Sequence, residues 1–190
     1  MATVLFVCTG NLCRSPSAEW LLNQHFAQQG PDGAWADSVG TVRTMGPPPA
    51  GLIAAGESYG MDVFLRSHQP RQLEYSDVEE AELVIGMTRQ HVRESVLLDR
   101  TSFPRAFTLR ELVRRAAGVG PRPPDQSLAQ WLSSVHAGRL TTDLIGESAA
   151  DDVDDPMGGA IDDYRGMLSE VSALIDALVS LMWSPVVTGP

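Results

Sequence analysis

Lysine is absent from this sequence, and all 14 basic residues are arginines. They are outnumbered by 24 acidic residues, so the formal net charge is −10. A negative field over the whole surface disfavours nucleic acid and anionic membranes as main partners, because both carry negative charge themselves. An anionic substrate is still compatible with this balance, provided that one local site concentrates positive potential.

Cysteine is scarce as well. The chain has only Cys8 and Cys13, which are too few for a disulfide framework and which fit a reducing compartment. No apolar run reaches the roughly 18 residues that a membrane-spanning helix needs. The stretch 1–7 lacks the basic leader of a signal peptide and has the pattern of a strand instead. We therefore expect a soluble, cytoplasmic protein without membrane insertion.

The sequence has the composition of an ordinary globular domain. Hydrophobic residues make up 43% and charged residues 20% of the chain, and this balance argues against extended disorder. A chain of 190 residues has room for one domain and is too short for two ordinary ones. It can also bury a core without disulfides or metal ions. We expect a single domain over residues 1–190.

Apolar runs alternate with helical repeats along the chain. Because parallel strands are joined by helices, this alternation predicts βαβ units and a parallel sheet. In such sheets, ligands bind beyond the carboxyl ends of the strands. Strands are expected at 3–8, 35–38, 81–87 and 103–109, and helices from about 15 and over 50–60, 88–98, 110–117, 128–136 and 159–183.

The segment 8–16, which follows the first expected strand, can form an anion site. Gly10 and Asn11 belong to the residue types that best tolerate positive φ. Ser15 is a good N-cap, and Pro16 suits the first helical position. A turn of this kind can direct successive backbone N–H groups at one centre, at the N-terminus of a helix. The segment therefore predicts a cradle for a phosphate-like anion.

Cys8 and Arg14 supply the chemistry of this cradle. Arg14 has a planar fork of donors that suits two oxygens of a phosphate. The helix N-terminus and the guanidinium favour the thiolate of Cys8 over the thiol, and the thiolate is the nucleophile. A cysteine at the end of a strand can also be only a small buried hydrophobe. The flanking strand, turn and helix start favour the functional interpretation.

These residues resemble the phosphate-binding loop of the low-molecular-weight protein-tyrosine phosphatases. Residues 37–41 resemble the family's Ser-Ala-Gly-Thr segment, and 67–73 resemble its His-x-Ala-Arg-Gln segment. Asp155 and Pro156 match the late Asp-Pro that carries the general acid. The resemblance covers roughly 3–117 and 150–180. It implies a three-layer α/β fold, in which helices cover both faces of a small four-stranded parallel sheet.

The resemblance also implies a reaction, metal-independent hydrolysis of a phosphomonoester without a cofactor. Cys8 would attack phosphorus and form a cysteinyl phosphate, while Arg14 and backbone N–H groups hold the oxygens. Asp155 would protonate the leaving oxygen and then activate water. Asp154 is the alternative acid, and Asp155 is preferred because proline follows it. The predicted phosphate-binding residues are Thr9, Gly10, Asn11, Leu12, Cys13, Arg14 and Ser15.

Polar residues outside this loop match those that brace it in the family. They are Ser38 and His68, which act with Asn11 and Ser15 inside the loop. A left-handed Asn11 needs its side chain pinned, and Ser15 can hydrogen-bond the thiolate. We interpret the remaining histidines and two of the tryptophans as packing residues: His25, His91, His136, Trp20 and Trp131.

Cys13 allows two interpretations. It can fill space behind the loop, or it can capture an oxidised Cys8 as a disulfide and protect that sulfur from irreversible oxidation. The family uses an adjacent cysteine in the second way, and we favour that role. The sequence shows no obvious metal-ligand spacing, and we expect no metal.

The match is weaker at the mouth of the site. Relatives that act on phosphotyrosine usually have an aromatic residue after Asp-Pro, where this chain has Met157, and often another in the loop that corresponds to 42–45, which has none. Leu12 favours a tyrosine-type pocket, because relatives that act on phosphoarginine tend to have threonine there. We favour a phosphotyrosine protein as substrate and keep a protein-arginine phosphatase as the alternative.

Two other functions are weaker alternatives. An arsenate reductase of the same fold is a weak alternative, because 70–100 contain no cysteine for electron transfer. A non-catalytic phosphate-binding module is disfavoured, because a nucleophile, an arginine and an acid are all present. The stretch 118–149 is longer than the family's usual connection, and we expect a surface insertion there. No feature of the sequence points to a particular oligomeric state.

Overall fold

A sheet of four parallel strands forms the centre of the computed structural model, which describes residues 3–29 and 33–183. Val7 pairs with Val39 on one side and with Gly86 on the other, so β1 lies inside the sheet. The order is β2-β1-β3-β4, and the predicted α/β fold with four parallel strands is confirmed. The strands are β1 (Thr3–Cys8), β2 (Trp35–Gly40), β3 (Leu83–Gly86) and β4 (Ala106–Thr108).

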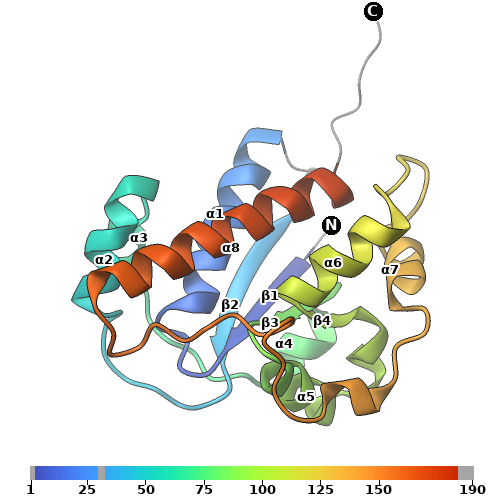
Figure 1. The fold of residues 1–190 in the computed structure, drawn as a ribbon, viewed down its shortest axis with the longest axis horizontal. Helices are drawn as coiled ribbons and strands as arrows, with labels where there is room; N and C mark the ends of the chain where they lie inside the picture. The colour runs from blue at the N-terminus through green and yellow to red at the C-terminus, as the bar shows by residue number, and fades with distance from the viewer. Residues whose placement is uncertain (1–2, 30–32, 184–190) are drawn as a thin grey trace, which may run out of the picture.

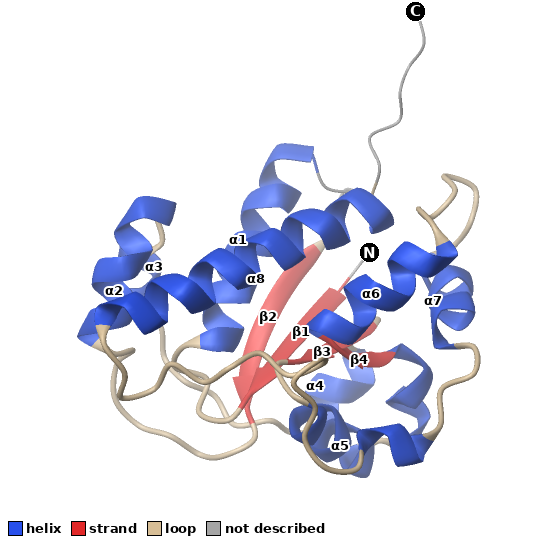
Figure 2. Ribbon diagram, viewed as in Figure 1, coloured by secondary structure: helices blue, strands red, loops and turns tan. Residues whose placement is uncertain are grey.

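Helices cover both faces of the sheet, which makes three layers (Figures 1 and 2). One face carries α1 (Arg14–Gln29), α6 (Leu109–Val119) and α8 (Ile161–Met182), with α2 (Ala50–Gly56) and α3 (Asp62–Ser67) beside them. The other face carries α4 (Tyr75–Glu80) and α5 (Arg89–Leu98). The remaining elements are α7 (Leu128–His136), which packs on α6, and the 3-10 turns Glu57–Tyr59, Arg100–Arg105 and Thr141–Leu144.

The side chains of β1 explain why both faces must be covered. Val4 and Phe6 pack into the core on the α1 and α8 side, while Leu5 and Val7 pack into the core on the α4 and α5 side. Successive side chains of a strand point to opposite faces, so a strand that is apolar throughout needs a cover on each side. This packing fixes the position of Cys8, the last residue of the strand.

Several element boundaries differ from those expected. α1 begins at Arg14 rather than at Ser15, because the Cys13 carbonyl accepts the first helical hydrogen bond, from Ser17 N at 3.2 Å. Ser15 therefore lies inside the first turn and is not the N-cap. The sequence Gly-Pro-Asp-Gly at 30–33 predicts a turn after this helix, but it lies largely outside the described residues. The short helices α3 and α4 were not predicted, since six residues are too few for a clear helical repeat.

The stretch 118–149, where we expect a surface insertion, contains residues that belong to the core. α7 buries Trp131, Leu132 and Val135 in the same cluster as α6 and α8. The indole Nε1 of Trp131 donates to the Gly120 carbonyl at 3.1 Å. The buried Arg139 guanidinium pairs with Glu111 of α6 at 2.7 Å. These contacts tie the stretch to the helical face next to β4, away from the end of β1.

The carboxyl ends of the strands meet the loop that precedes α8. In Figure 2 this loop crosses the sheet edge at the arrowheads of β1 and β2. Val153 N donates to the carbonyl of Met87, just after β3, at 2.8 Å. Within 3–29 and 33–183, none of the helices combines the length and the apolar character needed to cross a bilayer.

Candidate active site

Cys8 is buried at the end of β1 and receives two hydrogen bonds on its sulfur. The backbone N–H of Asn11 donates to Sγ at 3.2 Å, and the hydroxyl of Ser15 donates at 2.9 Å. Both donors lie on the short segment between the strand and the first turn of α1. Donors that converge on the sulfur are placed to complement negative charge on it during a reaction.

The side chain of Asn11 is pinned on both of its polar atoms. Its backbone has φ of 52°, which is a left-handed conformation that costs energy for any residue with a Cβ. Oδ1 accepts the backbone N–H of Arg71 at 2.9 Å, while Nδ2 donates to Ser15 Oγ at 3.1 Å and to Ser38 Oγ at 2.8 Å. These bonds hold the turn in the conformation that brings Asn11 N to the sulfur.

Glu19 extends this network and was missed in the sequence. Ser38 Oγ donates to Glu19 Oε2 at 2.6 Å. Burial raises the pKa of Glu19 to about 7, against the opposing effect of the Ser38 hydrogen bond. Because Glu19 follows Ser15 by four residues on α1, the two share one helix face, and this spacing is the signal that could have identified it.

His68 reaches the same turn from the end of α3. Its Nε2 lies 2.9 Å from the Asn11 carbonyl oxygen, and since a carbonyl only accepts, the ring nitrogen donates. Burial lowers the pKa of His68, and the bond to Asn11 opposes that effect in part. The histidine that the sequence placed among the loop-supporting residues thus contacts the backbone of the loop directly.

Gly40 allows the end of β2 to approach the loop closely. A Cβ at this position would lie 2.7 Å from the Thr9 carbonyl oxygen and 2.9 Å from Asn11 N. Both neighbours are backbone atoms, so neither can move aside. Thr41 N and Val42 N donate to the carbonyls of Cys8 and Thr9, each at 2.9 Å. Position 40 therefore requires glycine, because a Cβ there would collide with the backbone of the loop.

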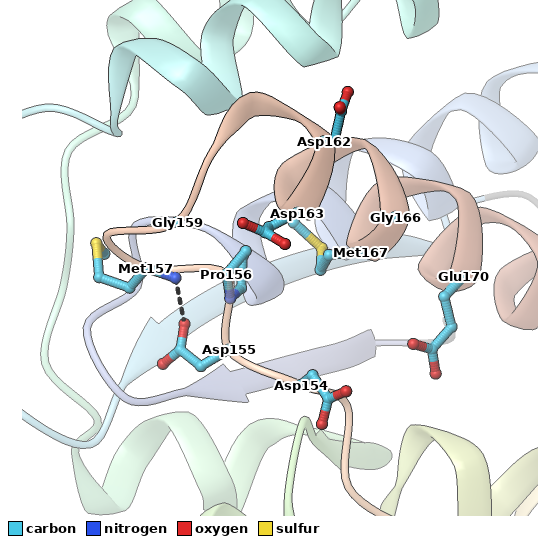
Figure 3. A pocket seen from close by; sticks show the side chains of 10 residues that line it. All are labelled: Asp154, Asp155, Pro156, Met157, Gly159, Asp162, Asp163, Gly166, Met167 and Glu170. Carbon is cyan, nitrogen blue, oxygen red and sulfur yellow. Dashed lines mark hydrogen bonds between the residues drawn. The ribbon is translucent and has the colours of Figure 1, made fainter.

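Arg14 is buried, and its guanidinium joins the loop to the segment before α8. Nη1 donates to the Val153 carbonyl at 3.1 Å, and Nη2 donates to Thr9 Oγ1 at 3.3 Å and to Asp155 Oδ2 at 2.6 Å. The carboxylate of Asp155 also accepts Met157 N at 3.2 Å (Figure 3). In Figure 3 the carboxylate of Asp154 points in a different direction. The structure thus brings Asp155 to the loop.

Asp151 anchors this acidic segment. It is buried, and its carboxylate accepts hydrogen bonds from Arg89 at 2.6 and 2.9 Å and from Arg114 at 2.6 Å. Burial works against its ionisation, but the bonds and charges of Arg114 and Arg89 hold its pKa below the ordinary value. The neighbouring Asp152 accepts the backbone N–H of Arg89 at 2.7 Å. Local sequence gave no sign of these distant pairs.

Cys13 is a free, buried thiol at the start of α1. Burial, followed by the charges of Cys8 and Asp155, raises its pKa to about 12, and Arg14 opposes this only in part. Cys13 is therefore a neutral thiol at physiological pH, and it lies close enough to Cys8 for the two to interact electrostatically. Within the described ranges, no group of three or more His, Cys, Asp or Glu side chains is placed to hold a metal ion.

At the positions where relatives that act on phosphotyrosine usually have aromatic residues, this chain has Val42, Met45 and Met157, with the polar Arg43 and Thr44 between the first two. Val42 and Met157 are exposed by about half, and Met45 is 86% exposed. Leu12, in the loop itself, is half-buried against the core cluster on the α1 side. Among the residues that the sequence assigned to the site, hydrogen bonds join Cys8, Asn11, Ser15, Ser38 and His68 in one group. Arg14 and Asp155 form a second group, which meets the loop at Thr9.

Comparisons with known proteins agree with this geometry. The family model described as low molecular weight phosphotyrosine protein phosphatase matches residues 3–120. A protein-arginine-phosphatase of Geobacillus stearothermophilus is 28% identical over 179 residues, which are 92% of each chain. The low molecular weight protein-tyrosine-phosphatase YfkJ of Bacillus subtilis is 34% identical over 97 residues, 48% of this chain and 60% of that protein.

Solved structures give the same result for the fold. The low molecular weight protein tyrosine phosphatase from T. tengcongensis has a TM-score of 0.67 and 28% identity, over 95% of this chain and 99% of that one. The YwlE arginine phosphatase from Geobacillus stearothermophilus has a TM-score of 0.65 and 26% identity, over 95% of this chain and 92% of that one.

Proposed function

Because this chain belongs to the low molecular weight phosphotyrosine protein phosphatase family, we propose that it removes phosphate from tyrosine residues of phosphorylated proteins in the cytoplasm. It is a cysteine-dependent phosphatase, and the finer assignment of substrate and residues is our proposal. One observation carries it: the loop that holds the Cys8 thiol at the end of β1 also holds Arg14, and the Arg14 guanidinium contacts both Thr9, the neighbour of Cys8, and the Asp155 carboxylate.

The first chemical step transfers the phosphoryl group to sulfur. The Cys8 thiolate attacks phosphorus, an S–P bond forms, and the bond between phosphorus and the tyrosine oxygen breaks. Arg14 and the backbone N–H groups of the loop stabilise the charge on the transferring oxygens. Asp155 gives its proton to the leaving oxygen, which departs as neutral tyrosine.

The second step regenerates the enzyme. Asp155, now a carboxylate, takes a proton from water as the water oxygen attacks phosphorus, and the S–P bond breaks. Inorganic phosphate leaves, and Cys8 returns to the thiolate that Ser15 and Asn11 N stabilise. No step requires a metal ion or an organic cofactor.

The ion pair between Arg14 and Asp155 must break when substrate binds. Asp155 Oδ2 accepts a hydrogen bond from Arg14 Nη2 at 2.6 Å. A phosphate oxygen would use the same donor. A phosphate dianion that binds the guanidinium therefore displaces the carboxylate. Asp155 stays over the site, because Asp151 and Val153 tether its segment. It can then face the leaving oxygen.

Phosphotyrosine and phosphoarginine are separated by different observations. The apolar Leu12, Val42 and Met157 can contact an aromatic ring, and methionine does so favourably. The alternative is favoured by two relatives that match over 92% of this chain, both protein-arginine-phosphatases, from Geobacillus stearothermophilus and Bacillus subtilis. We favour phosphotyrosine because Leu12 lies in the phosphate-binding loop itself.

Paired peptides test this assignment. Two peptides of the same sequence, one with phosphotyrosine and one with phosphoarginine, should differ at least about tenfold in kcat/KM in favour of phosphotyrosine. Leu12→Thr should narrow the difference, and Leu12→Ile is the matched control. A preference for phosphoarginine in the wild-type enzyme would exchange the two assignments.

Hydrolysis itself separates the remaining alternatives. In the presence of EDTA the protein should hydrolyse phenyl phosphate, and Cys8→Ser should not. If the protein were a phosphate-binding module, wild type and Cys8→Ser would both bind phosphate, and neither would hydrolyse phenyl phosphate. An arsenate reductase would consume thiols with arsenate, and Cys8→Ser would abolish that reaction instead.

We also propose that Cys13 protects Cys8 from oxidation. Peroxide converts the Cys8 thiolate to a sulfenic acid, and the thiol of Cys13 displaces water from it to form a disulfide. The test is recovery of activity with dithiothreitol after peroxide. Wild type should recover, whereas Cys13→Ser should lose activity permanently. Equal recovery of both proteins would remove this role.

A further inference from the structure

His91 lies beside the active site and is not part of the reaction described above. It is in the first turn of α5 and is 2% exposed. Its Nε2 lies 3.0 Å from Thr9 Oγ1, the hydroxyl of the residue after the nucleophile. The same hydroxyl oxygen lies 3.3 Å from Arg14 Nη2. One threonine side chain therefore connects a buried histidine to the phosphate-binding arginine.

The hydrogen bonds at the other side of the ring determine its tautomer. The backbone N–H of Thr88 donates to His91 Nδ1 at 3.0 Å, and Thr88 Oγ1, which can donate as well as accept, lies 3.0 Å from the same nitrogen. A backbone N–H cannot accept, so Nδ1 carries no proton, and in the neutral ring the proton is on Nε2. Nε2 is then the donor to Thr9 Oγ1. Burial, together with the charge of Arg14, lowers the pKa of His91 to about 3, so the ring is neutral at physiological pH.

Thr9 is held as an acceptor in this arrangement. A hydroxyl oxygen has two lone pairs and one proton. The N–H of His91 and the N–H of Arg14 occupy the lone pairs, and the hydroxyl proton is left for a third group. If His91 did not donate, the hydroxyl could rotate freely about its Cβ–Oγ1 bond and would not be held toward the guanidinium.

The acceptors on Arg14 fall into two kinds. Asp155 is charged and competes with a phosphate for the same N–H, whereas Thr9 Oγ1 and the Val153 carbonyl are neutral. Neutral acceptors can keep their bonds when a dianion takes the place of Asp155, since they carry no net charge to repel it. They alone, among these three, can hold the plane of the guanidinium while substrate binds.

We propose that His91 is a positioning residue, which by donating from Nε2 to Thr9 fixes the neutral acceptor that orients Arg14 toward phosphate. This inference rests on the proposed function, because it assigns Arg14 to the phosphate. It changes the interpretation of His91 from the sequence, where it was a packing residue. It goes beyond capping of α5, since the Thr88 bond alone would serve that purpose.

Two substitutions separate the cap from the contact with Thr9. His91→Asn keeps an acceptor near Nδ1 for Thr88 N and is too short to reach Thr9. His91→Gln can reach Thr9 with its amide N–H, as Nε2 does. We expect His91→Asn to weaken competitive inhibition by inorganic phosphate about fivefold to tenfold, the range of one hydrogen bond, and His91→Gln to stay within about twofold of wild type.

A double-mutant cycle with Thr9→Val tests whether the two residues act together. Thr9→Val removes the hydroxyl at constant shape, and adding His91→Asn to it should weaken phosphate inhibition no further. Additive effects, or equal loss in His91→Gln and His91→Asn, would overturn the proposal. Melting temperatures of all variants show whether a loss comes from unfolding.

A spectroscopic measurement keeps this inference separate from the proposed function. The ring nitrogens of ¹⁵N-labelled His91 in the wild-type protein should show a neutral ring with the proton on Nε2 at pH 7. A proton on Nδ1, or a charged ring, would refute the mechanism even in an active enzyme. If the wild-type enzyme hydrolyses no phosphomonoester, the proposed function fails, and phosphate binding followed by NMR still tests the coupling of His91 to Arg14.

Discussion

The two halves of the active site are built in opposite ways. The nucleophile half, residues 8–15, lies on one short segment and is held by buried bonds among Cys8, Asn11, Ser15 and Ser38. The acid half, residues 151–157, comes from the far end of the chain and is anchored at Asp151, while the side chain of Asp155 is 45% exposed. The first half is in place around the sulfur, and the second is tethered at Asp151, with the partly exposed carboxylate that we propose substrate displaces.

This difference assigns distinct tasks to the two halves. A group that must stabilise charge has to be in place before the reaction, because reorganising it costs energy. A group that first gives up and then takes back a proton must follow the leaving oxygen and then water. Arg14 belongs to the first half and contacts the second through Val153 and Asp155. Arg14 therefore connects the two halves.

Arg14→Lys should have the largest effect of the substitutions below, because it disturbs both halves. Lysine keeps the positive charge but lacks the planar fork that can hold phosphate, Val153 and Thr9 together. We expect kcat/KM for phenyl phosphate to fall on the order of 10³-fold or more. The exposed Arg165, changed to lysine, is the control. A loss of kcat/KM below about tenfold would mean that Arg14 does not connect the two halves.

Asp155→Asn should affect only the acid half. It should lower kcat for phenyl phosphate by roughly 10²-fold to 10⁴-fold and should strengthen inhibition by phosphate, because asparagine lacks the charge that competes with phosphate for Arg14 Nη2. The loss should be smaller for 4-nitrophenyl phosphate, whose leaving group departs without a proton. Asp154→Asn is the matched control and should stay near wild type. A larger loss in Asp154→Asn than in Asp155→Asn would move the acid role to Asp154.

Asp151→Asn tests the anchor of the arm. Since its pKa in the folded protein lies below the ordinary value, Asp151 contributes stability above that value, and the contribution is lost as pH falls through the lowered pKa. We expect unfolding by urea at pH 7 to show a loss of about 1–3 kcal/mol, because Arg114 and part of Arg89 are solvent-exposed. The difference from wild type should shrink in strong acid, and a constant difference would contradict the account.

Glu19→Gln tests the nucleophile half through the pH dependence of stability. The pKa of Glu19 is raised to about 7, so the folded state binds its proton more tightly than the unfolded state. Stability from this group is present below the ordinary pKa and declines as pH rises to about 7. Glutamine lacks this titration, so between pH 4.5 and 7 the free energy of unfolding of the variant should fall by about 2–3 kcal/mol less than that of wild type. Parallel curves from urea unfolding would refute the assignment.

The nucleophile half could be predicted from the sequence because its parts are local. Cys8, Asn11, Arg14 and Ser15 lie within eight positions, and a strand, a turn and a helix start determine their geometry. Asp155, which we propose as the acid, was assigned through the resemblance, by the proline that follows it. The anchor of its segment was not predicted, because the partners of Asp151 lie 62 and 37 residues away and meet it only after the sheet has formed.

The fold shows the same division. The strands and the long helices were predicted because their repeats extend over many residues, and the assignment of Ser15 as N-cap was wrong because the Cys13 carbonyl accepts the first helical hydrogen bond. His91 was interpreted as packing because nothing in its neighbourhood of the sequence points to Thr9. Contacts between a residue and a loop 82 positions away depend on the tertiary structure.

A rapid-quench experiment tests the central claim most directly. The wild-type enzyme is mixed with ³²P-labelled phosphotyrosine peptide and denatured within milliseconds, and the protein is digested and mapped. The account predicts label on the peptide that contains Cys8, as a cysteinyl phosphate that appears before phosphate is released and that Cys8→Ala does not form. Turnover without labelled protein, or label on any other residue, would contradict it.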